Sequence, residues 1–422
     1  MNRGLLWFRT DLRLSDNLAL QAAMENHSEI VPVYILDEQW LGEDDYGFQR
    51  TGAYRMQFLL ECLADLKAHL QETGSDLIIE KGNPAEIIPQ IAEKYGCSEV
   101  YCMKEYTSEE IKRERTLSKT YHLNFFHNST LIHPEDVSFD IGKLPEVFTT
   151  FKKKVEKYSE VRAVSSSPKS VESPVLEATE IPKITDFGFT DVKKDKRAVM
   201  QFKGGAKAAW ARIDDYFWEK EGLSEYKETR NGLIGADYSS KFSVWLAHGC
   251  ISARSIYQEV EQYEKEVEKN KSTYWMKFEL LWRDFFKYTA MRYGNGIFKA
   301  SGIKNKEKKW RHNPKTMQKW LDGETGDRFV DANMIELKET GFMSNRGRQN
   351  VASYLVHQLG QDWRVGAAWF ESQLIDYDVT SNYGNWIYAA GVGNDPRDRV
   401  FNTKRQADMY DKNGAFRELW LK

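Results

Sequence analysis

The first third of the chain alternates short apolar runs with amphipathic stretches. The apolar runs have the length of buried strands and span residues 4–8, 30–36, 77–80 and 100–103. Between the second and third runs, residues 51–71 place leucines on one face of a helix. Asn83 followed by Pro84 indicates another helix start, because proline fits the first turn of a helix. Strand–helix alternation of this kind predicts a parallel sheet covered by helices.

The pattern changes after residue 160. Residues 161–182, VRAVSSSPKSVESPVLEATEIP, are rich in Ser, Pro and Glu without a period, which is typical of a linker. After Phe202, helical spacing dominates, at residues 207–218, 252–268, 274–291, 345–359 and 363–374. A chain of 422 residues is too long for one ordinary core. We therefore expect an α/β, Rossmann-like parallel-sheet domain over 1–130, a linker over 131–200 and an all-helical domain over 201–422.

Composition narrows the class of protein. Hydrophobic residues make up 41% and charged residues 29%, which is typical of a soluble globular protein, and no apolar run is long enough for a membrane span. The N-terminus reads as a first strand rather than a signal peptide. Four cysteines without CxxC spacing favour a reduced, cytoplasmic protein and no zinc site (Cys62, Cys97, Cys102 and Cys250). With a net charge of −3, any nucleic acid must bind through a local basic patch.

Residues 374–398, LIDYDVTSNYGNWIYAAGVGNDPRD, interleave acids, amides and aromatic rings instead of following an apolar period. This mixture suits a pocket for a flat ligand with polar edges. Eleven of the 13 tryptophans follow residue 200, which fits either core packing or a stacking site. HExxH, Walker A and GxSxG motifs are missing, and the first strand is not followed by GxGxxG. We expect a bound cofactor to carry the chemistry, with His248 and His357 as packed or surface residues rather than catalysts.

Three other segments carry candidate chemistry, each with a plainer alternative. Residues 238–243, YSSKFS, precede a helix and form either an anion cradle or an ordinary N-cap. In residues 278–286, FELLWRDFF, Glu279 and Arg283 share a helix face. Either these two form a surface salt bridge, or Glu279 and Trp282 face a partly dry cavity. Residues 340–349, TGFMSNRGRQ, form either a solvated basic turn or a site for phosphate and ring edges at a loop-to-helix junction.

The ordered set of motifs resembles the photolyase/cryptochrome family, and within it the cryptochrome DASH branch. The resemblance spans essentially the whole chain. It rests on WFRTDLRLSDN, YKETRNGLIGADYSSKFS, STYWMKFELLWRDFF, GETGDRFVDANM, TGFMSNRGRQN and DYDVTSNYGNWIYAAGVGNDPRDR. The resemblance implies an α/β antenna domain joined by a long linker to a helical domain that holds a folded FAD.

By resemblance, the FAD contacts are Tyr226, Ser239, Ser240, Lys241, Phe242, Ser243, Asn345, Arg348, Asp376, Asp378 and Asn382. The serine run would lie at the pyrophosphate, and Arg348 would pair with Asp376. Asn382 would face flavin N5, where a neutral amide suits reduced flavin better than a carboxylate does. Asparagine at this position is similar to the DNA-repairing members.

The resemblance also implies two light-handling features. Trp386, Trp363 and Trp310 match the chain of tryptophans that passes electrons inward to the flavin, although the three rings could also simply pack. Glu105 matches the residue that contacts a folate antenna, 5,10-methenyltetrahydrofolate, between the domains.

The implied reaction is light-driven splitting of cyclobutane pyrimidine dimers that are flipped into a pocket. The implied substrate contacts are Glu279, Trp282, Gln349, Tyr388, Arg346 and Arg397. Tyr388 replaces the tryptophan of conventional photolyases, and stacking contributes roughly 1–3 kcal/mol per base. We therefore expect a preference for single-stranded or looped DNA. Asn345 and Gln349 stand where enzymes for (6-4) photoproducts carry histidines, so (6-4) repair is not expected.

Two other functions stay open. One is a blue-light photoreceptor that signals without repair, although signalling cryptochromes usually carry long C-terminal tails and this sequence ends at Lys422. The other is a redox flavoprotein that binds RNA or DNA without repairing it. We expect a monomer without a metal and without a membrane partner.

Overall fold

The computed structural model describes residues 2–190, 192–395 and 398–422. Its N-terminal part contains a five-stranded parallel sheet with the order β3-β2-β1-β4-β5. The strands are β1 (Arg3–Phe8), β2 (Glu29–Asp37), β3 (Ile78–Gly82), β4 (Cys97–Met103) and β5 (His122–Phe126). The four apolar runs predicted as strands are confirmed. The edge strand β5 escaped prediction because most of its side chains are only half-buried, so it carries no long apolar run.

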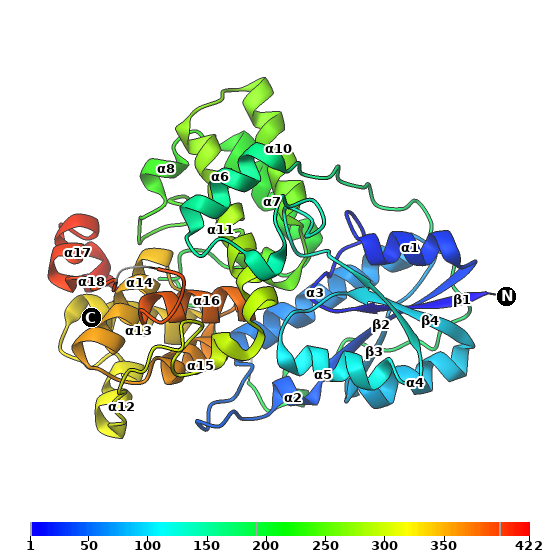
Figure 1. Cartoon of the computed structure of the whole chain (residues 1–422), viewed down its shortest axis with the longest axis horizontal. Helices are drawn as coiled ribbons and strands as arrows, with labels where there is room; N and C mark the ends of the chain where they lie inside the picture. Colours follow the sequence, from blue (N-terminus) through cyan, green and yellow to red (C-terminus); the bar gives the residue numbers. More distant parts are fainter. Residues whose placement is uncertain (1, 191, 396–397) are drawn as a thin grey trace.

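Helices cover both faces of this sheet because its strands are apolar on both sides. Leu6 and Phe8 of β1 join one core and Leu5 and Trp7 the other. Figure 1 shows α1 on one side and α4 and α5 on the other. The helices of this part are α1 (Leu18–Asn26), α2 (Glu38–Leu41), α3 (Ala53–Glu72), α4 (Pro84–Tyr95) and α5 (Ser108–Leu117).

The connection between the halves is irregular except for α6 (Phe148–Tyr158) and two short 3-10 turns, Ile141–Lys143 and Ile184–Phe187. Residues 161–182 contain neither helix nor strand, as predicted for a linker. The early part of the connection docks on the helical half, where both carboxylate oxygens of Asp284 accept backbone N–H groups, from Leu131 and Ile132, at 2.8 Å. The domain boundaries at 130 and 200 stay a prediction.

The C-terminal half is helical, as predicted, and extends from the top to the lower left of Figure 1. Its first six helices are α7 (Ala206–Ile213), α8 (Tyr226–Thr229), α9 (Ser243–His248), α10 (Ala253–Glu266), α11 (Lys271–Tyr293) and α12 (Pro314–Asp322). The remaining six are α13 (Arg328–Thr340), α14 (Asn345–Ser353), α15 (Trp363–Gln373), α16 (Val379–Ala389), α17 (Thr403–Tyr410) and α18 (Ala415–Trp420). The predicted helices 207–218 and 345–359 each end in a π-helical turn, at Asp214–Glu219 and Tyr354–Gln358.

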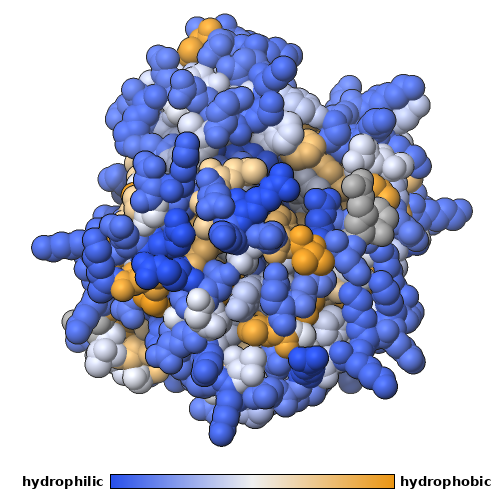
Figure 2. All heavy atoms as spheres, turned by 90° about the vertical axis from the view of Figure 1, so that its left-hand side faces the viewer, coloured by the Kyte–Doolittle hydropathy of each residue, from blue (hydrophilic) through white to orange (hydrophobic). Residues whose placement is uncertain are grey.

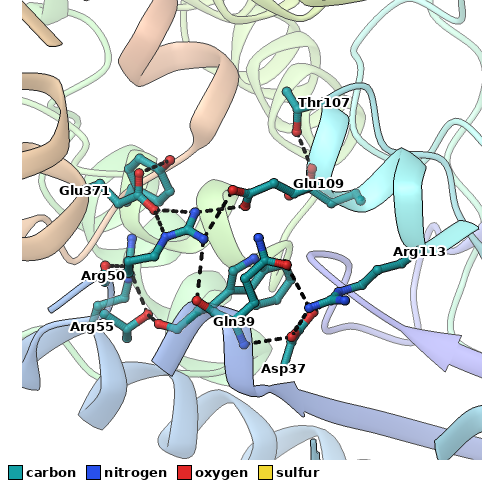
Figure 3. A network of polar contacts seen from close by, with 12 residues as sticks. Asp37, Gln39, Arg50, Arg55, Thr107, Glu109, Arg113 and Glu371 are labelled. Atoms are coloured by element: carbon teal, nitrogen blue, oxygen red, sulfur yellow. Dashed lines mark hydrogen bonds and ion pairs between the residues drawn. The ribbon is translucent and has the colours of Figure 1, made fainter. Parts of the chain in front are cut away.

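A polar network joins the two halves (Figure 3). Arg50, from the loop before α3, lies 2.9 Å from Glu109 of α5 and 3.0 Å from Glu371 of α15. Beside it, Arg113 pairs with Asp37 and donates to Gln39 at 2.9 Å. Asp37, Glu109 and Glu371 of this network are therefore each paired with an arginine. No helix in the described parts of the chain is long and apolar enough to cross a membrane.

Candidate functional site

Arg348 and Asp376 form the predicted pair in the helical half. Nη2 of Arg348 donates to both carboxylate oxygens of Asp376 at 2.9 Å, and only 1% of the Asp376 side chain is exposed. Arg348 is held in place because its Nε also donates to the Met343 carbonyl at 2.9 Å. The predicted loop-to-helix junction is confirmed, since Ser344 caps α14 and Asn345 is its exposed first residue.

Asp378 caps α16 and is held as an anion. Its carboxylate accepts the Ser381 N–H at 2.8 Å, the Thr380 hydroxyl at 2.7 Å and Lys287 Nζ at 3.0 Å. Burial alone would raise its pKa, but the cations Lys287 and Arg283 outweigh burial and hold the pKa below its usual range. Lys287 was missed by the sequence analysis, although it lies two helical turns after Glu279 on α11.

The serine run is folded around a buried lysine. Lys241 is 3% exposed. Its backbone has a positive φ of 63°, which residues other than glycine rarely adopt. Its Nζ donates to Ser239 Oγ at 3.0 Å and lies 2.9 Å from the centroid of the Tyr238 ring. Arg212 fixes the backbone by donating to the carbonyls of Ser239 and Ser240 at 3.2 and 3.1 Å.

The N-cap alternative for the serine run is wrong. The cap residue of α9 is Phe242, whose side chain makes no capping bond, and Ser243 is already the first residue of the helix. The start of α9 is therefore capped by none of these side chains, Lys241, Ser239 or Ser240.

Two amides of the predicted site residues keep a buried oxygen without a hydrogen-bond partner in the described chain, namely Asn382 Oδ1 and Gln349 Oε1. The other end of the Asn382 amide donates to the Ala367 carbonyl at 3.0 Å. A buried polar atom left unpaired costs free energy, so such atoms fit a ligand that brings donors. The polar edge of a flavin ring is a ligand of this kind, and the residues present therefore fit FAD.

The three tryptophans of the predicted electron chain run from the core outward. Trp386 and Trp363 are fully buried and Trp310 is half-buried. The indole N–H groups of Trp310 and Trp363 donate to the same carbonyl, that of Ala300, at 3.2 and 3.3 Å. A side chain at Gly366 would collide with the Trp386 ring, so this glycine on α15 leaves the room that Trp386 fills.

Glu279 does not pair with Arg283, so the surface salt bridge considered from the sequence is not formed. Oε1 of Glu279 accepts Arg230 Nη1 at 2.6 Å and Trp275 Nε1 at 3.1 Å. Arg283 instead donates to the Ser129 carbonyl. Burial raises the pKa of Glu279, and Arg230 only partly opposes this. The carboxyl group is thus held from one side.

Trp282 and Tyr388 form an aromatic corner. Trp282 lies flat on Phe148 with ring centroids 3.7 Å apart and an interplanar angle of 10°. Tyr388 stands perpendicular to Trp282, at 5.8 Å and 88°. The Tyr388 hydroxyl accepts a hydrogen bond from Arg399 at 2.9 Å, and burial raises the pKa of this tyrosine to about 12. Phe148 was missed because it lies far from α11 in the sequence.

The remaining predicted contacts are placed less uniformly. Tyr226 is buried on α8. Arg346 is half-buried and donates to Asn231 at 2.8 Å, so residues 340–349 are more than a solvated turn. Glu105 accepts the Thr10 hydroxyl at 3.0 Å, and burial raises its pKa to about 7 although Arg9 opposes the shift. Arg397 lies outside the described residues.

The histidines favoured as packing residues are packed. Nε2 of His248 lies 3.0 Å from the Ile375 carbonyl, and Nε2 of His357 lies 3.0 Å from the Ala389 carbonyl. Within the described ranges, no group of three or more His, Cys, Asp or Glu residues could hold a metal ion.

The side of the molecule that carries α17 and α18 is largely hydrophilic, with hydrophobic side chains gathered near its middle (Figure 2).

Two family models match this chain. The model of DNA photolyase matches residues 4–172, and the model of the FAD binding domain of DNA photolyase matches residues 275–422. The first covers the parallel sheet, and the second covers α11 to α18.

Relatives match nearly the full length. Cryptochrome DASH of Gloeobacter violaceus is 46% identical over 99% of this chain and 85% of its own length. Cryptochrome DASH of Danio rerio is 46% identical over 98% of this chain and 82% of its own length. The crystal structure of a Synechocystis cryptochrome superposes with a TM-score of 0.96 at 47% identity, covering 100% of this chain and 89% of the other. A bacterial class III photolyase from Agrobacterium tumefaciens gives a TM-score of 0.86 at 28% identity, covering 100% and 86%.

Proposed function

Because this chain belongs to the cryptochrome DASH group of the photolyase/cryptochrome family, we propose that it is a light-dependent lyase that splits cyclobutane pyrimidine dimers in DNA. Its preferred substrate is single-stranded or looped DNA. The observation that carries the proposal is the corner of Trp282 and Tyr388 with the carboxyl group of Glu279. A pure photoreceptor has no use for such a corner.

FAD, which the family's FAD binding domain holds, would supply on illumination the electron that opens the dimer and would take it back once the two bases separate. In the proposal, Lys241, Ser239 and Ser240 hold the pyrophosphate. Phosphate oxygens would accept the serine hydroxyl hydrogens and would favour the charged form of Lys241, whose pKa burial lowers. Arg348, Asp376 and Asp378 hold the ring and ribose edges. The unpaired oxygen of Asn382 would accept a hydrogen bond from the flavin edge. The other cofactor contacts are Tyr226, Phe242, Ser243 and Asn345.

The dimer enters the aromatic corner as a flipped dinucleotide. Trp282 offers one ring face and Tyr388 a perpendicular wall, so two bases joined at an angle find a surface each. Glu279 donates or accepts a hydrogen bond at a base edge. Its raised pKa permits both, because the protonated carboxyl group becomes accessible. Arg230 keeps the Glu279 carboxyl group in place, and the unpaired Gln349 oxygen adds a second polar contact.

Preference for unpaired DNA follows from the stacking surface. A tyrosine at position 388 offers less ring area than a tryptophan, and stacking contributes roughly 1–3 kcal/mol per base. Flipping from a duplex costs a few kcal/mol and is cheapest for bases that are already unpaired. Arg346 would contact a phosphate, as would Arg397, and binding would weaken as salt rises.

Electrons reach the flavin through Trp310, Trp363 and Trp386 in this proposal. Their exposure falls from half-buried to buried along that order, and two of them share the Ala300 carbonyl. In this proposal an electron passes stepwise from the half-buried Trp310 inward to Trp386.

A folate, 5,10-methenyltetrahydrofolate, is proposed as the antenna at Glu105. The support is a half-buried carboxyl group whose pKa of about 7 lets it accept or donate to a pterin edge. The same proposal includes three further points. The domain limits lie at residues 130 and 200, the protein is a cytoplasmic monomer, and RNA is a second ligand. Four buried free thiols suit a reducing compartment (Cys62, Cys97, Cys102 and Cys250).

The test is illumination of the FAD-loaded, reduced protein with dimer-containing oligonucleotides, single-stranded and duplex. We expect splitting that is several-fold faster on the single strand. Glu279→Gln should lower splitting roughly 10–100-fold, the value of a charged hydrogen bond, and leave light-driven reduction of oxidised flavin intact. Trp386→Phe should leave splitting by the reduced protein intact and strongly lower the light-driven reduction of oxidised flavin.

Two outcomes would count against the proposal. Equal rates on matched single-stranded and duplex substrates would remove the substrate preference. No splitting of either substrate, with flavin photoreduction intact, would favour a blue-light photoreceptor that signals without repair.

A further inference from the structure

Glu336 is a buried carboxyl group that the folded chain leaves without a partner. It lies on α13, is 1% exposed, and neither of its side-chain oxygens has a hydrogen-bond partner in the described chain. An unpaired buried carboxyl group is among the costliest features that a fold can carry. Burial raises its pKa to about 8, with Lys241 and Arg348 opposing the shift.

The cations around Glu336 are bound elsewhere. Lys241 donates to Ser239, and Arg348 binds Asp376. Both cations lie beside the ring of Phe342, with Lys241 Nζ 5.9 Å and Arg348 Cζ 5.6 Å from its centroid. Neither forms an ion pair with Glu336 within the described residues, although both act on it electrostatically.

A second unpartnered group lies in the same place. The hydroxyl of Tyr238 is buried and has no hydrogen-bond partner in the described chain. Its pKa is raised well above the usual range by burial first and then by the charges of Glu336 and Asp376. The segments that carry Tyr238, Glu336 and Arg348 thus lie together, and these three side chains form no hydrogen bond with one another in the described chain. A ligand whose polar groups reach all of them would satisfy the arrangement.

We propose that Glu336 binds the ribityl hydroxyl groups of FAD. This assignment rests on the proposed placement of the cofactor, with its pyrophosphate at Lys241 and its ring system at the Arg348–Asp376 pair. In FAD the hydroxylated ribityl chain joins those two parts. Glu336 neighbours both Lys241 and Arg348. Burial favours its protonated form in the chain alone, whereas O–H groups donated by a hydroxylated ligand favour the carboxylate, which repels phosphate.

The first experiment measures FAD affinity of the full-length protein after removal of its own flavin, from the quenching of flavin fluorescence. We expect Glu336→Gln to weaken FAD binding about tenfold, since a hydrogen bond to a charged group becomes a neutral one. Glu339→Gln is the matched control, because Glu339 lies on the same helix with an exposed side chain, and its FAD affinity should be unchanged.

The second experiment identifies the group that Glu336 binds. The wild type and Glu336→Gln are titrated with FAD analogues that lack the ribityl 2′-, 3′- or 4′-hydroxyl in turn. With the analogue that lacks the bound hydroxyl, the two proteins should have the same affinity. A tenfold difference that persists with all three analogues, or tighter FAD binding by Glu336→Gln, would overturn the assignment.

Stability of the flavin-free protein separates binding from a structural role. Because Glu336 has no partner in the chain, Glu336→Gln and Glu336→Leu should melt at or above the wild-type temperature without FAD. Both should gain less from added FAD than the wild type gains. A lower melting temperature without FAD would show that the carboxyl group supports the fold and would overturn the assignment. The readout is FAD affinity, so a wild type that binds FAD without splitting dimers would count only against the repair proposal.

Discussion

The domain interface and the proposed FAD site of the helical half differ in whether every buried carboxyl group has a partner in the described chain. At the interface, Arg50 of the α/β half pairs with Glu371 of the helical half (Figure 3). Beside it, Arg113 pairs with Asp37 within the α/β half. In the proposed FAD site, Glu336 has no partner in the described chain. The interface is complete without a ligand, so its charges hold two halves together. The proposed FAD site is incomplete, so its charges are arranged for a molecule that the chain does not itself contain.

The largest expected effect is at the interface. Arg50→Met removes the cation of Glu371 and leaves a buried carboxylate with only the Tyr377 hydroxyl, 2.9 Å away. The free energy of unfolding should fall by about 3–5 kcal/mol, the cost of breaking one side of a buried pair. Denaturant unfolding measures this change, and FAD affinity should stay unchanged.

Arg162→Met is the matched control for Arg50→Met. Arg162 forms an exposed pair with Asp136, at 2.6 Å, and exposed pairs contribute about 0–1 kcal/mol. If Arg50→Met cost no more than this control, the interface charges would not hold the halves together and the comparison would fail.

The next effect is a loss of stability in mild acid through His248. This ring packs 5.0 Å from Phe58 of α3, and burial lowers its pKa to about 4. An unfolded histidine takes up a proton near pH 6.5, whereas the folded one resists until about pH 4. Stability should therefore fall as the pH drops through this window, by about 2 kcal/mol between pH 7 and 5.

Denaturant unfolding of the wild type and His248→Gln at both pH values measures this contribution. Glutamine can still donate to the Ile375 carbonyl, but it does not titrate. The variant should lose about 2 kcal/mol less than the wild type between pH 7 and 5. Equal losses in both proteins would show that His248 is free to take up its proton in the folded state.

A smaller effect is expected at the pocket amide. Asn382→Leu removes one hydrogen bond to Ala367 together with an oxygen that has no partner. Stability without FAD should therefore change by no more than about 1 kcal/mol, whereas FAD should bind about tenfold more weakly. Fluorescence titration and thermal melting with and without FAD report the two quantities.

Asn385→Leu is the control for the pocket amide, because Asn385 is exposed on the same helix. Its FAD affinity should match the wild type. A large loss of stability in FAD-free Asn382→Leu would show that this amide stabilises the fold without a ligand, as the interface groups do.

The smallest effect concerns the aromatic corner. Tyr388→Trp enlarges the stacking wall and should add about 1 kcal/mol of binding, which is roughly a fivefold gain. The gain should be most visible with duplex substrate, where flipping limits binding, so the ratio of single-stranded to duplex repair should fall. Paired oligonucleotide repair assays measure this ratio. An unchanged ratio would show that stacking area at this position does not set the preference.

The elements that the sequence predicts well are those with a local signature. Continuous apolar runs predict four strands, and β5 was missed because an edge strand needs fewer apolar residues. Helical spacing predicts the long helices, whereas the π-helical turn at Tyr354–Gln358 leaves no mark in an apolar period. The break into π geometry depends on what the helix packs against.

Partners of the site residues were harder to predict. Arg348 and Asp376 were paired through the family resemblance, and the structure confirms the pair. The partner of Glu279 is Arg230, not the neighbour four residues along the helix. Phe148 reaches Trp282 from the connection between the domains. Such contacts join segments far apart in the chain, and a residue's own neighbourhood in the sequence carries no sign of them.

The docking of Leu131 and Ile132 on Asp284 has a consequence for synthesis of the chain. The acceptor lies about 150 residues after its donors, so a ribosome adding 5–20 residues per second makes it roughly 8–30 s later. The parallel sheet can fold as soon as it emerges. The connecting segment, with the Phe148 ring that Trp282 will cover, must stay unpacked until α11 leaves the tunnel. A nascent chain paused between these points would expose apolar surface that chaperones recognise.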